Sequence, residues 1–169
     1  MTAEPAETAE PAETAEWAAT GEAAVLSTAT CSVTRDSIHK FALATGATDP
    51  IYLDPAAARL HGYHDVVAPA YFFVSLGLSL DQIRPRSELS AAGMPLDDTL
   101  ALCKVVAGET SVDWYGEIIA GDDVTVTCSF LGMSRKQGRS GVFEVHWFQR
   151  DYSRGPDLLI RERYSRIAR

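Results

Sequence analysis

Cysteine is scarce in this 169-residue sequence, and the spacing of the cysteines indicates neither a set of disulfide bonds nor a metal site. Cys31, Cys103 and Cys128 are odd in number and far apart, without the paired spacing of a zinc site or a disulfide scaffold. The four histidines show no zinc spacing either. This pattern is typical of reduced thiols in a cytoplasmic protein.

Excess basic charge and long apolar runs are also lacking. The formal net charge is −8, which excludes the clustered positive charge that phosphate binding needs, so nucleic acid is not an expected partner. No apolar run approaches a membrane span, and the acidic N-terminus lacks the basic segment of a signal peptide. With 46% hydrophobic residues the chain can bury the core of one domain without disulfides or a structural metal.

The first residues repeat a hexapeptide of Ala, Glu, Pro and Thr, as in "AEPAETAEPAETAE". No large apolar side chain occurs before Trp17, so this segment cannot offset its ordering entropy by burial. We predict a disordered, solubilising tail over residues 1–21 and a folded domain over residues 22–169. A tail that docks a partner is the alternative.

Three helices are expected in the first half of the domain, after a strand rich in small and β-branched residues at 23–34. Thr34 or Asp36 caps a helix that ends at Gly46, and Asp54 caps a second one. Residues 68–80, "APAYFFVSLGLSL", are apolar all round, which predicts a helix buried on every side. The polar stretch 81–99 is interpreted as an excursion or lid.

The second half reads as strands and turns with alternating apolar residues. One apolar helix followed by such a meander predicts an α+β fold in which a curved antiparallel sheet wraps a buried central helix. His146 is out of phase with Val145 and Trp147 and is expected to point away from their apolar face, while His39 is expected to face solvent. The expected strands lie at 109–119, 123–133, 141–152 and 157–168.

Two segments, "ATGATDPIYLDPAAAR" with "GYHDVVAP" and the later "YGEIIAGDDVTV", resemble the MaoC-like and FAS1-type (R)-3-hydroxyacyl-thioester dehydratases. The likeness covers roughly residues 23–169 and implies a single hot-dog fold. Active members of that family carry Gly-Asp-x-Asn-Pro-x-His in the loop before the short helix, where the aspartate and histidine handle a water and the α-proton of the substrate. The resemblance implies an acyl thioester substrate, on acyl carrier protein or coenzyme A, and no metal or redox cofactor.

Both proton-handling positions of that loop are substituted here. Ala47 stands for the aspartate and Tyr52 for the histidine, while Asp49 occupies the asparagine position. Alanine transfers no proton, and a phenol with an ordinary pKa of about 10 is a poor base at neutral pH. The other loop positions keep the motif or fill its free places: Gly46, Thr48, Pro50 and Ile51.

This pattern resembles the non-catalytic subunit of heterodimeric dehydratases. It implies that the chain contributes acyl binding and half of a continuous sheet, and that a second hot-dog subunit brings the intact Asp/His pair. The assembly is expected to be a heterodimer or a dimer of heterodimers, with a homodimer as the alternative, in fatty-acid-like or polyketide chemistry. Neither nucleic acid nor membrane is expected as a partner.

Two further functions stay open. A shifted dyad of Asp49 and His64 would supply a carboxylate–imidazole pair able to act as a general base. Against it, Asp49 before Pro50 is ordinary turn chemistry. A non-enzymatic module that binds an acyl chain or a protein is the other alternative. Thioesterase activity is disfavoured, because the apolar helix has no carboxylate before Asp81.

Four residues are expected to contact the substrate. The start of the apolar helix offers free backbone N–H groups at Ala70 and Tyr71, which the resemblance relates to the thioester carbonyl. Pro69 removes one N–H there. Trp114 can line an acyl pocket, although an aromatic residue in a strand is more often core or dimer interface.

Overall fold

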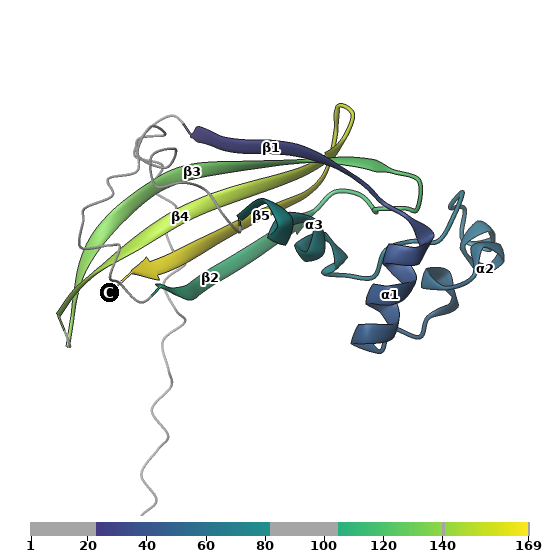
Figure 1. The fold of residues 1–169 in the computed structure, drawn as a ribbon, viewed down its shortest axis with the longest axis horizontal. Coiled ribbons are helices and arrows are strands. Elements are labelled where there is room, and N and C mark those ends of the chain that lie inside the picture. Colours follow the sequence, from purple (N-terminus) through teal and green to yellow (C-terminus); the bar gives the residue numbers. More distant parts are fainter. Residues whose placement is uncertain (1–22, 82–104, 140, 169) are drawn as a thin grey trace, which may run out of the picture.

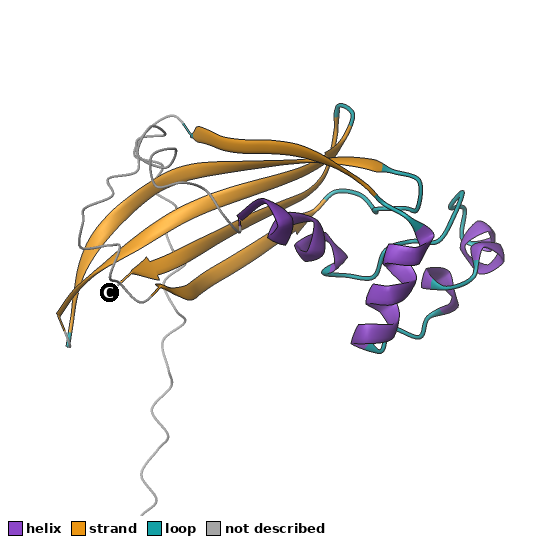
Figure 2. Ribbon diagram, viewed as in Figure 1, coloured by secondary structure: helices purple, strands orange, loops and turns teal. Residues whose placement is uncertain are grey.

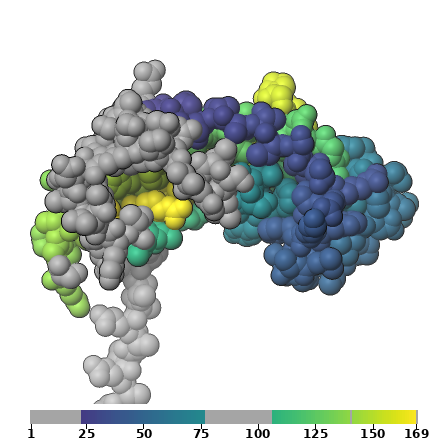
Figure 3. Space-filling view, viewed as in Figure 1, coloured from purple at the N-terminus to yellow at the C-terminus, as the bar shows by residue number. Residues whose placement is uncertain are grey.

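The computed structural model describes residues 23–81, 105–139 and 141–168. They form one five-stranded antiparallel sheet in the order β1-β3-β4-β5-β2, with the helix α3 on its concave face (Figures 1 and 2). The sheet curves along its length, and α1 and α2 lie beyond one end of it, as the space-filling view also shows (Figure 3). The elements are β1 Ala24–Ser32, α1 Arg35–Thr45, the 3-10 turn η1 Pro50–Tyr52, α2 Pro55–Leu60, α3 Phe72–Asp81, β2 Val105–Trp114, β3 Asp123–Gly138, β4 Gly141–Arg154 and β5 Asp157–Ala168.

The predicted α+β layout, a curved sheet on a central helix, is therefore confirmed. The helix caps are also as predicted: the Thr34 side chain accepts a hydrogen bond from the Ser37 amide, and Gly46 ends α1 in the left-handed conformation at φ 69°. Asp54 caps α2 through the amide of Ala56. The tail at 1–21 and the lid at 81–99 lie outside the described residues, apart from Asp81.

The prediction for the apolar helix was wrong in two respects. The helix begins at Phe72 rather than at 68, because Tyr71 has φ 66° and the turn before it is closed by the Phe72 amide donating to the Pro69 carbonyl. The helix is not covered on every side either, since Ser75 is exposed while Phe73 and Leu76 are buried.

The strand expected at 109–119 also differs. It begins at Val105 and ends at Trp114, because the amides of Tyr115 and Gly116 both turn to the Leu159 carbonyl. From there the chain crosses towards β3, and only Ile119 pairs again, with Val67.

β4 places His146 on the other side of the sheet from Val145 and Trp147, as their alternation predicts. That side is the one that Tyr152 shares and that packs against Phe73. His146 is accordingly buried, with its Nε2 3.1 Å from a carboxylate oxygen of Glu144. The odd-numbered apolar residues face the opposite side of the sheet.

The core lies between α3 and the sheet. Its buried members come from every part of the described chain, so the site loops are held by the same cluster that stabilises the sheet. They are Val33, Ile38, Val66, Ala68, Phe72, Phe73, Leu76, Ile118, Ala120, Val124, Val126, Tyr152, Leu159 and Ile160.

Candidate functional site

The motif loop keeps its backbone scaffold. Gly46 closes α1, and the Ala47 amide donates to the Ala42 carbonyl at 2.9 Å, which turns the chain back over the helix end. The Asp49 carboxylate then accepts the amide of Ile51 at 3.0 Å and caps η1. The loop thus keeps the backbone conformation of the motif, while Ala47 has a methyl group at the position where a carboxylate would act.

Tyr52, Asp49 and His64 are the other candidates for proton transfer, and each has a different environment. Tyr52 is half-buried at the end of η1, and its hydroxyl forms no hydrogen bond with another described residue. The Asp49 carboxylate serves as a cap, and His64 is exposed. Among the described residues no hydrogen bond joins Asp49 to His64. The shifted dyad therefore stays a hypothesis that activity measurements must decide.

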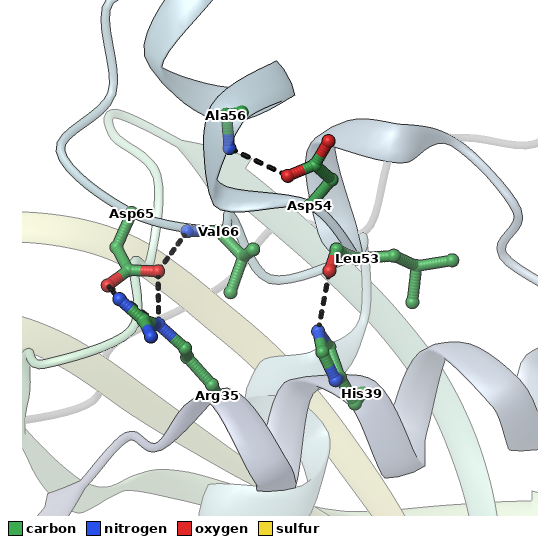
Figure 4. Close-up of polar contacts among 7 residues, drawn as sticks. All are labelled: Arg35, His39, Leu53, Asp54, Ala56, Asp65 and Val66. Atoms are coloured by element: carbon green, nitrogen blue, oxygen red, sulfur yellow. Dashed lines mark hydrogen bonds and ion pairs between the residues drawn. The ribbon is translucent and has the colours of Figure 1, made fainter.

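An ion pair braces the loop that leads to α3 (Figure 4). The Arg35 guanidinium, at the start of α1, binds both carboxylate oxygens of Asp65, with Nε–Oδ1 at 2.7 Å and Nη2–Oδ2 at 2.6 Å. Asp65 also accepts the Val66 amide at 2.8 Å. The hydrogen bonds from Arg35 lower the pKa of Asp65, so the carboxylate stays charged across the neutral range.

His39 adds a second brace, which corrects the prediction that it faces solvent. It is half-buried, and its Nε2 lies 2.9 Å from the Leu53 carbonyl oxygen (Figure 4). The carbonyl can only accept, so Nε2 carries the proton. Since Leu53 directly follows the motif loop, α1 holds both ends of the segment that joins η1 to α3.

The segment before α3 is tied to the β2–β3 connection. The Val67 amide donates to Ile51, and the Ala68 amide donates to Ile118. The turn after Ile119 is locked by Asp122, whose carboxylate accepts the Ile119 amide at 2.9 Å. The motif loop, the entry to α3 and the family-like Ala-Gly-Asp turn are therefore one connected unit.

The predicted substrate contacts meet at the start of α3. Pro69 is buried, and the amides of Ala70 and Tyr71 donate no hydrogen bond within the described residues. The Tyr71 ring stacks on Phe73 at 5.7 Å and lies 6.3 Å from Trp114, between ring centroids. Tyr71 and Trp114 are 59% and 46% exposed, so aromatic surface is open beside the free amides.

Four residues near this point were not singled out from the sequence. Phe73 contacts Trp114 at 5.3 Å and Tyr152 at 5.1 Å, between ring centroids. Beyond Tyr152 lies a buried ion pair, in which Arg150 Nη1 is 2.9 Å from Glu162 Oε2. The signal was present: Arg150 and Tyr152 are two apart on β4, so a strand pattern places a charge on the core side next to a core tyrosine.

The family model described as "FAS1-like, dehydratase domain region" matches residues 18–159. The chain belongs to this family. A UPF0336 protein of Clavibacter michiganensis subsp. michiganensis is 36% identical over 110 residues, which cover 65% of this chain and 68% of that protein. The family membership predicted from the motif loop is thus confirmed.

Solved structures similar to this family member include complexes of two chains. A chain of the ChsH1-ChsH2 complex from Mycobacterium tuberculosis has a TM-score of 0.68 at 22% identity, covering 83% of this chain and 82% of that chain. A chain of the HadBC (3R-hydroxyacyl-ACP dehydratase) complex from the same organism has a TM-score of 0.64 at 15% identity, covering 82% and 90%. At these identities the likeness establishes the hot-dog fold. No described helix is long and apolar enough to cross a membrane.

Proposed function

We propose that this chain is the acyl-binding, non-catalytic subunit of an (R)-3-hydroxyacyl thioester dehydratase. The observation that carries the proposal is the motif loop: its capped, braced backbone is intact, while Ala47 and Tyr52 stand where a carboxylate and an imidazole would act. Such a loop can support the geometry of a site without moving protons. The assembled enzyme reversibly removes water from a 3-hydroxyacyl thioester, on acyl carrier protein or coenzyme A, to give the 2-enoyl thioester.

The partner in this proposal is a second hot-dog subunit with an intact Gly-Asp-x-Asn-Pro-x-His loop. Support comes from the edge of the sheet. β2 pairs only with β5, and its other edge is free among the described residues. That strand exposes Val106 and Trp114, at 41% and 46%, whereas the exposed residues of the opposite edge strand are mostly Thr and Ser. An edge with apolar side chains invites pairing with another chain.

We place the assembly in the cytoplasm, in fatty-acid-like or polyketide chemistry. Cys31 is a free thiol in the described part of the chain, which suits a reducing compartment.

The first test is hydration of crotonyl-CoA by the purified chain, alone and mixed with a dyad-bearing partner. We expect activity only in the mixture, and none when the partner's loop histidine is replaced by alanine. Activity from this chain alone, abolished by His64→Ala, would instead establish the Asp49/His64 dyad. A chain that stays a homodimer and binds acyl-CoA without turnover in any mixture would be a binding module.

A gain-of-function variant gives an independent test. Ala47→Asp with Tyr52→His restores both proton-handling groups on the existing scaffold, and should give this chain measurable hydratase activity without a catalytic partner. Tyr52→His alone is the matched control. It lacks the carboxylate, so the imidazole has no charged partner and we expect little activity.

A further inference from the structure

On the face of the sheet beneath α3, an apolar group of residues is followed two residues further along the strands by a group that contains charged residues. Residues paired across the five strands form rows on this face, and successive rows are two residues, or about 7 Å, apart. The row under the start of α3 contains Ala29, Val126, Tyr152, Ile160 and Trp114. The next row contains Ser27, Cys128, Arg150, Glu162 and Val112.

Phe73 of α3 closes the space over the first row. Its ring packs edge-on against both Tyr152 and Trp114, at the centroid distances given above. Phe73 and Tyr152 are 1% and 0% exposed, so together they fill the layer between helix and sheet. Phe73 and Tyr152 thus form an aromatic wall, and the exposed Tyr71 ring stacks on the Phe73 member of this wall.

Hydrogen bonds to Glu162 fix the position of Tyr152 in the wall. The Tyr152 hydroxyl donates to Glu162 Oε2 at 3.2 Å, and the same oxygen accepts the Arg150 guanidinium. Arg150 also stacks over the Tyr164 ring at 4.3 Å. Burial raises the pKa of Tyr152, so its hydroxyl keeps the proton it donates. A hydrocarbon pushed past the wall would meet a buried ion pair and would break these bonds without replacing them.

We propose that Phe73 and Tyr152 form a stop that limits the site of this subunit to short acyl groups. The inference rests on the proposed function and on the expectation that the thioester carbonyl binds at the Ala70 and Tyr71 amides. From there an acyl chain that follows the exposed Tyr71 and Trp114 rings meets the Phe73 ring, which contacts both of them. The substrates are then short-chain 3-hydroxyacyl thioesters rather than long fatty acyl groups.

The experiment measures binding of butyryl-CoA and dodecanoyl-CoA to the full chain by calorimetry, alone and mixed with the dyad-bearing partner. Apolar ligand surface adds affinity only when a protein buries it. We therefore expect the longer chain to bind no more tightly than the shorter one. Phe73→Ala should tighten dodecanoyl-CoA binding by about tenfold or more while butyryl-CoA binding changes little.

Two further variants keep the result interpretable. Phe73→Leu keeps most of the side-chain volume, so it is expected to fold and to shift the preference in the same direction by less. Phe41→Ala removes an aromatic ring that packs on Phe72 at 5.5 Å, away from the wall. It should lower stability without altering the preference for chain length.

Tighter binding of dodecanoyl-CoA by the unaltered chain would overturn the inference. So would a Phe73→Ala protein that is folded and has an unchanged preference, or absence of binding of either ligand. The proposed function is tested separately. If the chain-length preference is as expected and no mixture hydrates crotonyl-CoA, the result supports the stop formed by Phe73 and Tyr152 and contradicts the dehydratase role.

Discussion

Arg150 and Glu162 are the residues at which a single change should cost the most stability. Both side chains are almost fully buried, at 4% and 8% exposure, and the pair contacts Tyr152 as well. Glu162→Leu removes the carboxylate partner of a buried guanidinium, so we expect a loss of about 3–5 kcal/mol in the free energy of unfolding. Urea denaturation followed by circular dichroism measures it.

The double variant Arg150→Met with Glu162→Leu separates charge from packing. It leaves no buried charge and similar volume, and it should recover most of the stability that Glu162→Leu loses. A double variant as unstable as the single one would show that the pair stabilises the fold by itself rather than merely compensating its own burial.

Tyr71 carries backbone strain at the start of α3. Its φ of 66° lies in the left-handed region, which disfavours residues with a Cβ. Tyr71→Gly and Tyr71→Ala both remove the ring that stacks on Phe73, but only glycine relieves the strain. We expect the glycine variant to be more stable than the alanine variant by about 1 kcal/mol in thermal or chemical unfolding. Equal stabilities would mean that the backbone relaxes when the ring is lost.

Ala47 and Tyr52 could be recognised from the sequence because a loop motif places its residues at fixed spacing. The wall of Phe73 and Tyr152 could not, since Phe73 lies on α3 and Tyr152 on β4, and they meet only when the helix packs on the sheet. Alternation separated His146 correctly from Val145 and Trp147, but alternation alone does not say which side of a strand packs against the helix.

Among the elements, α1 holds the site loops in place through the pair of Arg35 with Asp65. Because the pKa of Asp65 is lowered in the fold, its contribution is complete above the unfolded aspartate value, about 3.9, and is lost as the pH falls through the lower folded value. Arg35→Met should therefore lower stability at neutral pH and flatten the acid side of the pH profile. Unfolding between neutral pH and about pH 3 tests this.

The matched control lies on the same helix. Lys40 pairs with Asp36, but both side chains are more than 70% exposed, so the pair is screened by solvent. Lys40→Met should leave the pH profile nearly unchanged. A profile that flattens equally in both variants would mean that general helix charge, and not the brace, sets the acid sensitivity.

Helix caps were readable from the sequence, since a cap needs only local residues such as Thr34, Gly46 and Asp54. The start of α3 was misplaced because the strained turn at Tyr71 depends on tertiary contacts: Pro69 is fixed in the core and the Tyr71 ring packs across to Trp114. Propensity alone favoured helix from 68 onwards, and the tertiary contacts prevailed.

At the scale of the whole molecule, the sheet has two edges, and β2 offers more apolar contact than β1. β1 exposes Val25, and its Thr28 and Thr30 hydroxyls bond to threonines of β3, whereas β2 exposes both Val106 and the larger Trp114. We therefore expect the second subunit to join the sheet along β2.

Val106→Lys tests this edge. A lysine on an edge strand disfavours pairing with another strand, because its charge would have to be desolvated in the interface. The variant should fold normally and associate with the dyad-bearing partner at least about tenfold more weakly, as measured by sedimentation or light scattering of the mixture. Val142→Lys is the control: it is 61% exposed at the hairpin between β3 and β4, away from the β2 edge, and should leave association intact. If Val142→Lys weakens association and Val106→Lys does not, the subunits meet through another part of the surface than the β2 edge.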